Sequence, residues 1–469
     1  RDLLPHGYEV HLYEKDPAGG GMMRSQIPAF RLPIEVLEEE VEQILDMGVN
    51  THFNHEITSM KAFLEEDFDA VFVGTGAPRG RDLELPGRAE THAHISIGID
   101  WLSSVAFGHT SKIEGKVIVM GGGNTAMDCC RTAKRLGAES VSVVVRSAFE
   151  VMKASDWEKE DAMAEGIPII NNRPPKEFVH ENGKLKGVIF ECVKPVEEDG
   201  RLKYVPSGEP DVFMEADHIL MAIGQENHCP WIERDVGIEF DKWDCPILDE
   251  DTLQSSNPKV FFGGDAALGP ENIIWASAHA HKAAISIHLF CQGRDLKADR
   301  PPEGVNLISQ KMGVHEWSYD SAHDPAERYL VPHVERKKAL SDIKVEVELG
   351  FDKALGAKEA QRCLNCDVQT VFTEKLCIEC DACVDICPMD CITFTDNADE
   401  ESLRTRLTAP AANLEQDLYV SEELTTGRVM VKDEDVCEHC GLCAERSPTN
   451  AWDMQKSVFH IPQLGSYAE

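Results

Sequence analysis

The chain has 469 residues, 42% of them hydrophobic and 28% charged, a composition typical of a globular protein with about three domains. Because 46 Lys and Arg face 83 Asp and Glu, the formal charge is −37, which argues against a nucleic-acid partner and an anionic membrane surface. No apolar run in the sequence reaches the roughly 18 residues that span a bilayer, so we expect no membrane insertion.

The N-terminal two thirds of the sequence alternates short β-branched segments with helical stretches and Gly-rich turns. This pattern predicts an α/β architecture built from doubly wound parallel sheets. Buried strands are expected at residues 9–13, 70–73, 116–120, 141–145, 218–222 and 260–262.

The first expected strand, residues 9–13, is followed by Glu14. In a dinucleotide-binding fold the second strand leads to an acidic residue that bonds a ribose hydroxyl. We therefore interpret residues 9–13 as that second strand and expect the first strand and its Gly-rich turn upstream of residue 1. The chain also begins without Met, in agreement with its interpretation as a fragment.

Gly-rich turns follow several other expected strands. Each alone is more often a plain turn than a cofactor contact, so the argument depends on their order along the chain. Asp265, after the strand at 260–262, is a candidate hydrogen-bond partner for a ribityl chain. The candidate glycines are Gly20, Gly21, Gly74, Gly76, Gly224 and Gly264.

The strand at 116–120 runs directly into a G-x-G-x-x-A turn that opens a helix. Small residues in such a turn let the backbone approach a pyrophosphate. A second strand begins about 20 residues later, as a βαβ unit requires. A plain tight turn is the alternative. The candidate contacts are Gly121, Gly123, Asn124, Thr125 and Ala126.

Arg146 ends the strand at 141–145, where an acidic residue would hold the 2′-hydroxyl of NAD. An Arg can accept the 2′-phosphate of NADP instead. Arg146 therefore favours NADP(H) but leaves NADH open, and a solvated cation at a strand end is the alternative.

Pro301-Pro302-Glu303-Gly304 indicates a boundary, and residues 305–360 are expected to be mixed and mostly helical or loop. Beyond them lie the cysteine motifs. The first run has the C-x₂-C-x₂-C-x₃-C-P spacing of bacterial ferredoxins, with Cys377, Cys380, Cys383 and Cys387 before Pro388. The second run has Cys437, Cys440 and Cys443, but Ser447 stands before Pro448 where a fourth cysteine is expected.

In this spacing the fourth cysteine of each run ligates the other cluster. One 4Fe-4S cluster is therefore expected on Cys437, Cys440, Cys443 and Cys387, and the other set is one thiolate short. The second site is a three-iron cluster, a Ser447-ligated cubane, or a cubane completed by another cysteine. The candidates for such a cysteine are Cys391 and the pair Cys363/Cys366.

A structural zinc site is the alternative for these motifs, but zinc usually takes two separated pairs of ligands, which triplets fit poorly. For Cys363/Cys366 alone, a zinc half-site, a cluster ligand and a free thiol pair are equally open. Dense C-x₂-C runs without a signal peptide indicate a reducing compartment, so we expect a cytoplasmic protein.

The order of motifs resembles the small (β) subunit of glutamate synthase and its NAD(P)H-oxidising flavoprotein relatives. The resemblance covers roughly residues 1–295. The motifs that carry it are Glu14, Gly19-Gly20-Gly21-Met22-Met23-Arg24, Ile27-Pro28-Ala29-Phe30-Arg31-Leu32-Pro33, Gly121 to Asp128, Ala222-Ile223-Gly224-Gln225, and Gly263-Gly264-Asp265 with Gly269-Pro270.

This resemblance implies an FAD domain split by an inserted NAD(P) domain. The FAD-binding domain would comprise residues 1–110, truncated at the N-terminus, and residues 226–300. The NAD(P)-binding domain would comprise residues 111–225. A linker or helical segment at 301–361 and a ferredoxin-type 4Fe-4S domain at 362–469 would follow. The resemblance places Glu14 and Asp265 on FAD, with Met22 and Arg31 as further cofactor contacts, and Gly121, Gly123 and Ala126 on the pyridine dinucleotide.

The C-terminal fusion is most similar to the iron–sulfur flavoprotein that accompanies dissimilatory sulfite reductase (the DsrL type), and related fusions serve 2-oxoacid:acceptor oxidoreductases. The resemblance implies hydride exchange between NAD(P)H and FAD and single-electron exchange with the clusters. Since the cofactors carry this chemistry, no catalytic side chain is expected, and His279 and His281 are assigned to packing or surface.

The resemblance implies a partner redox protein, of the sulfite reductase type or another oxidoreductase subunit; a homodimer is left open. One alternative is a glutamate synthase small subunit. Another is a ferredoxin-like electron carrier in which the nucleotide-binding domains are vestigial.

Overall fold

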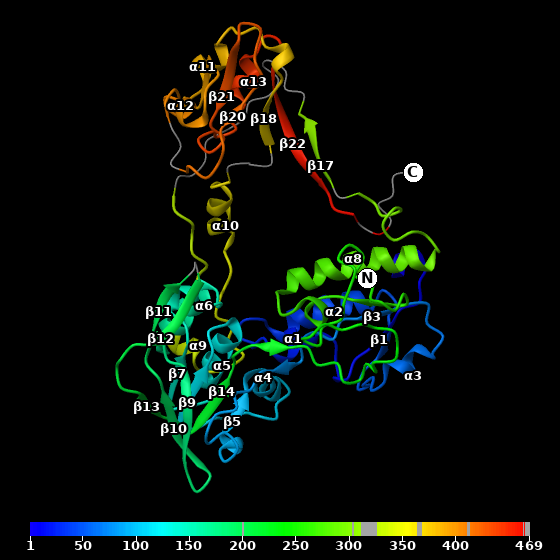
Figure 1. Ribbon diagram of the computed structural model, residues 1–469, viewed down its shortest axis with the longest axis vertical. Helices are drawn as coiled ribbons and strands as arrows, with labels where there is room; N and C mark the ends of the chain where they lie inside the picture. Colours follow the sequence, from blue (N-terminus) through cyan, green and yellow to red (C-terminus); the bar gives the residue numbers. More distant parts are fainter. Residues whose placement is uncertain are drawn as a thin grey trace. The chain divides into compact units, whose positions relative to one another are not determined.

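The computed structural model describes residues 1–198, 201–302, 304–310, 326–363, 368–409, 413–462 and 464. They form two compact units (Figure 1). The first unit comprises Arg1–Pro301 and His333–Leu349, and the second comprises Pro302–Pro332 and Gly350–Pro462.

A five-stranded parallel sheet with the order β5-β14-β6-β7-β8 forms the centre of the first unit. Its strands are β5 (Ile95–Ile97), β6 (Lys116–Met120), β7 (Ser140–Val144), β8 (Ile169–Ile170) and β14 (His218–Met221).

Both faces of this sheet are buried, which explains why its central strands β6 and β14 are nearly continuous apolar runs. Side chains alternate between the faces, so Val117 and Val119 of β6 belong to one core cluster while Ile118 and Met120 belong to another. The first cluster includes residues of the flanking helices, which are α4 (Gly98–Ala106), α5 (Asn124–Arg135) and α6 (Asp156–Ala164).

Antiparallel strands accompany the second cluster, which includes Phe178 and Phe190. They form a three-stranded sheet, β13-β10-β9, a separate hairpin, β11-β12, and a short pair, β15-β4. The bounds are β4 (Arg79–Gly80), β9 (Pro175–Glu181), β10 (Lys184–Phe190), β11 (Val193–Glu198), β12 (Arg201–Pro206), β13 (Val212–Glu215) and β15 (Gln225–Glu226).

Two small parallel sheets lie in the remaining part of this unit. One pairs β1 (His11–Tyr13) with β2 (Asn50–His52), and the other pairs β3 (Val71–Val73) with β16 (Val260–Phe262). The helices of this part are α1 (Gly21–Ser25), α2 (Ile34–Leu45), α3 (Met60–Leu64), α7 (Asp265–Leu268) and α8 (Ile273–Cys291).

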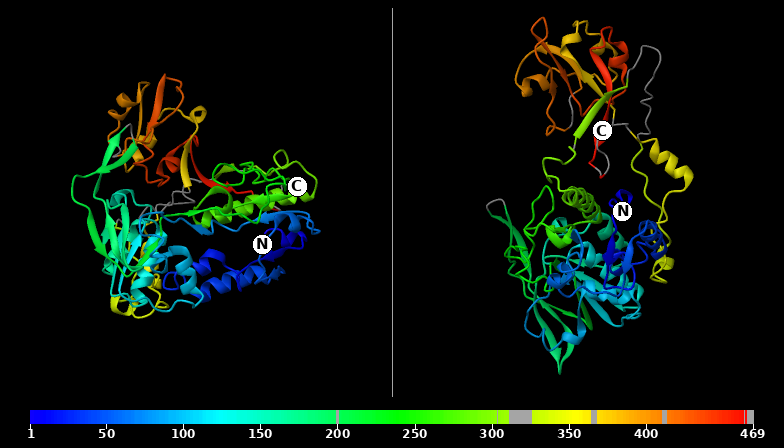
Figure 2. Two further views of the ribbon diagram at one scale, coloured as in Figure 1. Left: turned by 60° about the horizontal axis from the view of Figure 1, so that its bottom comes forward. Right: turned by 90° about the vertical axis from the view of Figure 1, so that its right-hand side faces the viewer.

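Helix α8 runs beside the first residues of the chain in both views of Figure 2. Tyr8 Oη and His288 Nδ1 are 2.8 Å apart, and His281 pairs with Asp2. These contacts tie the N-terminal segment to α8.

Residues 333–349, which include α9 (Arg336–Ala339), return to the first unit. Ala339 and Val347 form a small core with Phe30, and the Val347 N–H donates to the Phe30 carbonyl at 3.1 Å. The Arg336 guanidinium donates to the Glu165 carbonyl at 2.6 Å. This segment is called the strap below.

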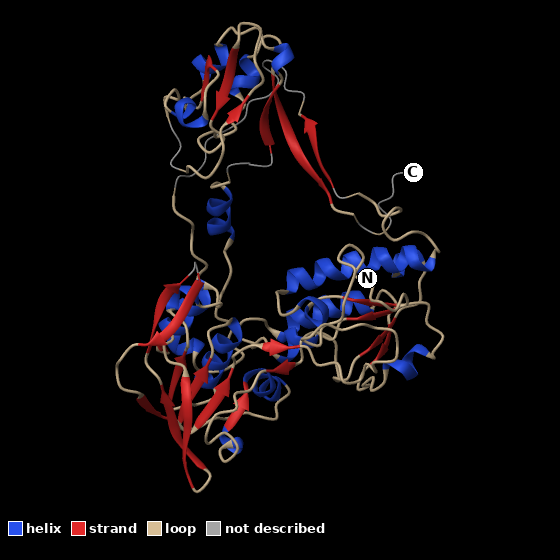
Figure 3. Cartoon of the chain, in the orientation of Figure 1, coloured by secondary structure: helices blue, strands red, loops and turns tan. Residues whose placement is uncertain are grey.

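The second unit contains two three-stranded sheets, β17-β22-β18 and β19-β21-β20, with short helices (Figure 3). Its strands are β17 (Gly304–Ser309), β18 (Val368–Phe372), β19 (Ile392–Asp396), β20 (Tyr419–Val420), β21 (Arg428–Lys432) and β22 (Trp452–His460). Its helices are α10 (Lys353–Ala360), α11 (Ala382–Ile386), α12 (Glu400–Arg404) and α13 (Leu442–Arg446). Single 3₁₀ turns occur at Leu4–His6, His92–His94, Phe149–Val151 and Glu374–Leu376 across the two units.

The doubly wound α/β prediction is confirmed, and the strands expected at 116–120 and 260–262 have those bounds. Within the stretch expected to be mixed and mostly helical or loop, residues 304–309 form a strand, β17, because β22 offers them a six-residue antiparallel pairing. Among the described residues, no helix combines the length and apolarity needed to cross a bilayer.

Candidate functional site

The carboxyl ends of the five parallel strands meet at one edge, where α/β sheets bind their ligands. Gly121 follows β6 with φ of 137°, and a Cβ on it would lie 2.0 Å from the Ala222 carbonyl oxygen. Only glycine fits this position. Gly123 precedes α5, and no side chain caps the helix. The backbone N–H groups of Asn124 and Thr125 at the start of α5 can therefore bind an anion, whereas the Ala126 N–H donates to the Gly123 carbonyl at 2.9 Å.

Two further candidates lie at this edge. The Asn124 side chain is engaged locally, since its Oδ1 accepts the Ser155 N–H at 2.9 Å. Arg146, just beyond β7, is exposed and has no ion-pair partner among the residues that the structure describes. Arg146 is thus available to a phosphate, whereas Asn124 supports the neighbouring loop.

The second group of candidates follows β1, β3 and β16. Gly20 and Gly76 have φ of 116° and 72°, and a Cβ on Gly76 would lie 3.1 Å from Met22 Cε. The turns at Gly20–Met22 and at Gly76 are therefore neighbours. Glu14 lies directly after β1, and its Oε1 accepts the Asp16 N–H at 3.0 Å.

The ends of β3 and β16 meet around the Phe72 ring. A Cβ on Gly74 would lie 3.0 Å from this ring, and a Cβ on Gly263 would lie 2.8 Å from it. Although Phe72 lies within a strand, it is 41% exposed. The glycines that end both strands therefore border one exposed aromatic face.

The loop after β16 is held by its own polar contacts. The Gly264 N–H donates to His279 Nδ1 at 3.3 Å, and Asp265 Oδ1 accepts the Glu271 N–H at 3.1 Å. Partial burial raises the pKa of Asp265. Gly224, with φ of 123°, lies at the end of the β14 segment, where its carbonyl accepts the Arg81 N–H at 3.0 Å.

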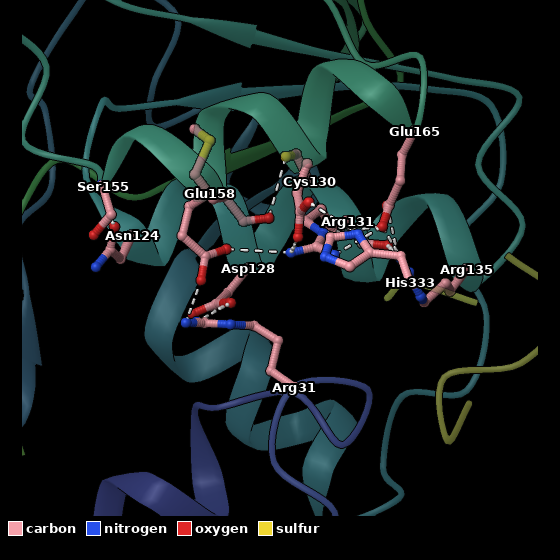
Figure 4. A network of polar contacts seen from close by, with 12 residues as sticks. Arg31, Asn124, Asp128, Cys130, Arg131, Arg135, Ser155, Glu158, Glu165 and His333 are labelled. Atoms are coloured by element: carbon pink, nitrogen blue, oxygen red, sulfur yellow. Dashed lines mark hydrogen bonds and ion pairs between the residues drawn. The ribbon is translucent and has the colours of Figure 1, made fainter. Parts of the chain in front are cut away.

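Arg31 has a different environment from the other candidates. Its guanidinium points toward two carboxylates of the neighbouring helices, as Figure 4 shows. Arg31 is 2.8 Å from Asp128 of α5 and also pairs with Glu158 of α6. Burial raises the pKa of Asp128 to about 6, and the Arg31 charge opposes this rise. The described contacts of Arg31 thus place it in an ion network.

The network continues along α5 through Arg131 and Arg135, which both contact Glu165. Arg131 is 2% exposed and also reaches Glu158 and Asp161 at 3.2 and 3.1 Å. The Phe30 ring lies 5.0 Å from the Arg131 guanidinium and 3.9 Å from that of Arg135. Sequence reasoning missed this network because its members are far apart in the chain.

In the second unit, the two cysteine runs surround two cavities, both partly open to solvent. The first, cavity A, is lined by Cys387, Cys391, Cys437, Cys440 and Cys443. The second, cavity B, is lined by Cys377, Cys380, Cys383 and Ser447, with Asp381, Phe372, Phe394 and Trp452 among its other residues.

The structure thus brings together the two crossed sets that the spacing predicts. Cys391, however, lines cavity A and not the deficient set, because the turn after Pro388 directs it there. Cys363 is exposed and lines neither cavity. Cys366 lies outside the described residues.

Two of the cysteines of cavity A, Cys387 and Cys437, are favoured as thiolates, whereas burial raises the pKa of Cys440 and Cys443. Cys391 Sγ is 3.5 Å from Cys387 Sγ. Hydrogen bonds from the Cys391 thiol are the main cause that lowers the pKa of Cys387 to about 6 and that of Cys437 to about 5. Four thiolates around one cavity are the ligand set of a 4Fe-4S cluster, so the residues of cavity A fit such a group.

A buried lysine lies next to cavity A. Lys432 of β21 is fully buried, and its Nζ is 2.6 Å from Thr370 Oγ1 and 2.8 Å from Glu434 Oε1. Burial acts to lower its pKa, but charges at Cys437 and Glu434 outweigh it and raise the pKa. The sequence of β21 did not predict that this lysine lies beside a cysteine-lined cavity.

Comparison with known proteins gives two family matches. Residues 2–280 match the model described as pyridine nucleotide-disulphide oxidoreductase, and residues 376–451 match a 4Fe-4S dicluster domain.

Among curated proteins, the chain is 34% identical over 378 residues to the NADP(+)-dependent formate dehydrogenase subunit beta of Moorella thermoacetica, covering 78% of this chain and 52% of that protein. It is 30% identical over 397 residues to the NADPH-Fe(3+) oxidoreductase subunit beta of Geobacter sulfurreducens, covering 78% of this chain and 58% of that one. The chain spans about half the length of the curated relatives it matches.

Among solved structures, Mycobacterium tuberculosis FprA in complex with NADPH matches with a TM-score of 0.50 at 16% identity, covering 61% of this chain and 77% of FprA. At this identity the similarity concerns the fold of the first unit.

Proposed function

Because the chain belongs to the pyridine nucleotide-disulphide oxidoreductase family and carries a 4Fe-4S dicluster domain, we propose that it is an NAD(P)H-dependent iron–sulfur flavoprotein subunit. In this role it moves electrons to or from a partner redox protein. The observation that carries the proposal is the presence, in one chain, of the Gly121 turn at a parallel sheet edge and of two cysteine-lined cavities.

When bound, the nicotinamide and flavin supply hydride transfer and the clusters supply single-electron transfer. The chain's own residues bind and orient these groups. The Gly121 turn and the start of α5 would hold the pyrophosphate. The thiols of cavity A would hold iron.

For the flavin, the residues that fit are those after β1, β3 and β16. Glu14 at the end of β1 would accept a ribose hydroxyl, and Asp265 would bond the ribityl chain. Gly20, Gly21 and Gly76 have positive φ angles, which favour glycine at these turns, so the backbone can approach a ligand there.

We propose NADP(H) as the coenzyme. Its 2′-phosphate needs a cation at the end of the second strand, and exposed Arg146 has that position after β7. Two relatives carry NADP(+) or NADPH in their names, which supports the same choice.

Anaerobic titration of the full-length, reconstituted protein tests this function. NADPH is expected to bleach the flavin and cluster absorbance and to do so at lower concentration than NADH. Arg146→Glu is expected to raise the NADPH concentration required at least tenfold and to leave the NADH response unchanged. Lys186→Met, which removes a cation from the exposed Lys186–Glu181 pair, is the control.

Protein that shows cluster absorbance but neither flavin bands nor a response to either coenzyme would contradict the proposal and support a simple electron carrier. Zinc without acid-labile sulfide would contradict the assignment of the cavities.

The partner is proposed to be a larger oxidoreductase subunit in a reducing compartment, the cytoplasm. The resemblance to the sulfite reductase-associated flavoprotein supports a sulfite reductase-type partner, and the formate dehydrogenase relative supports a different dehydrogenase. Affinity purification from the native host, followed by identification of the co-purified subunit, distinguishes the two.

A further inference from the structure

The sulfur ligands are divided unequally between the two cavities. Cavity A is lined by five cysteines, whereas cavity B is lined by three. A cubane needs four ligands, one for each iron. The surplus thiol, Cys391, lines cavity A, where its Sγ lies within hydrogen-bonding distance of Cys387 Sγ at 3.5 Å. It therefore does not supply a ligand to cavity B.

The difference arises from two substitutions at equivalent positions. Cys387 directly follows helix α11, and Ser447 directly follows helix α13. The φ and ψ angles are −66° and 114° at Cys387 and −69° and 113° at Ser447. Four residues further on, Cys391 corresponds to Ala451. The second run has therefore replaced both sulfur atoms while keeping the backbone of the first.

Ser447 is a poor substitute for a thiolate. Its side chain is 7% exposed and lines cavity B, but its Oγ already accepts the Ala451 N–H at 2.9 Å. An alkoxide is also more basic than a thiolate, so the serine hydroxyl loses its proton less readily when it binds iron. The aromatic side chains Phe372, Phe394 and Trp452 form much of the remaining wall.

One other oxygen ligand faces the same region. Asp381 lines cavity B, and its buried Oδ1 has no hydrogen-bond partner among the described residues. Its Oδ2, however, accepts a bond from Arg428 at 3.2 Å, which holds the carboxylate in an ion pair. Any role of this oxygen as a fourth ligand can be separated from that of Ser447 by substitution.

We propose that cavity B holds a three-iron cluster on Cys377, Cys380 and Cys383, while cavity A holds a four-iron cluster. Ser447 then keeps the shape of the site without ligating iron. The inference rests on the proposed function only in that both cavities hold iron and sulfide.

The test is anaerobic reconstitution of the full-length protein, followed by iron and sulfide analysis and electron paramagnetic resonance of the oxidised state. An oxidised three-iron cluster is paramagnetic, whereas an oxidised four-iron cluster of this type is silent. The wild-type protein is expected to show the oxidised signal and to hold one iron fewer than two cubanes need.

Ser447→Cys is expected to abolish the oxidised signal and to add one iron per chain. Ser447→Ala and Asp381→Asn are expected to leave both signal and iron content unchanged. Ser341→Cys, which adds a cysteine at an exposed site of the first unit, is the control and should not change either readout.

An oxidised wild-type protein that is silent and carries the full iron of two cubanes would overturn this inference but not the proposed function. Loss of iron in Ser447→Ala or in Asp381→Asn would overturn it as well, because it would identify an oxygen ligand. Zinc in place of iron would overturn the proposed function itself.

Discussion

The position of Arg31 gives a sharp prediction, because the sequence motif and the structure assign it different roles. Arg31→Met removes the cation that pairs with Asp128 and Glu158, whose side chains are 8% and 3% exposed. Breaking a buried pair from one side costs about 3–5 kcal/mol. Since the Arg31 side chain is itself 27% exposed, we expect the lower end, about 3 kcal/mol.

This loss should depend on pH. The folded-state pKa of Asp128, about 6, lies above its ordinary value of 3.8, so the folded state binds this proton more tightly than the unfolded state. The corresponding stability is present below about pH 4 and is lost as the pH rises through about 6. A protonated Asp128 needs no counter-charge, so Arg31→Met should destabilise the protein less near pH 5 than near pH 7.

Thermal unfolding followed by circular dichroism at both pH values checks this. For a unit of this size, a loss of about 3 kcal/mol corresponds to a fall in apparent Tm of about 4 °C. Arg31→Met/Asp128→Asn should recover part of the loss at pH 7. Lys61→Met breaks a pair of two exposed side chains, Lys61 and Asp235, and should leave the apparent Tm nearly unchanged.

The reasoning fails if Arg31→Met melts like the wild-type protein at pH 7. If such a variant instead loses bound flavin, Arg31 contacts the cofactor, as the sequence motif suggests.

Three further variants test other parts of the structure. Gly121→Ala places a Cβ 2.0 Å from the Ala222 carbonyl oxygen, so NADPH binding measured by fluorescence titration should be lost; unchanged affinity would contradict the Gly121 turn. Phe30→Ala removes a ring that is 1% exposed and should cost about 3–5 kcal/mol in denaturant unfolding; a loss below about 1 kcal/mol would show that the strap does not depend on this ring. Lys432→Met removes a buried cation and leaves the Glu434 charge that it neutralised. The midpoint potential of the cavity A cluster should therefore fall in a redox titration monitored by electron paramagnetic resonance. An unchanged potential would exclude an electrostatic role for Lys432.

Local patterns were sufficient to predict the central elements of the first unit. Residues 116–120 form a strand because five consecutive residues, most of them apolar, precede a Gly-rich turn. The crossed cysteine sets were also predictable, because the C-x₂-C spacing confines three ligands to one loop and the proline-linked residue to the other.

Features that depend on long-range contacts were not predictable. Strand β17 exists because it pairs with β22, about 150 residues away in the chain, as in Gly304 with His460. The location of Cys391 depends on the direction of one turn, and the network around Arg131 joins residues from separate segments. In each case the sequence shows the residue type but not its neighbours.

The strap has a consequence for the freedom of the cysteine-bearing unit. Since residues 333–349 are anchored on Phe30 and Glu165, the cysteine-bearing unit is joined to the first unit at both ends of the strap as well as at Pro301–Pro302, and not by a single linker. Shorter linkers raise the local concentration of a tethered domain and restrict the distance it can reach.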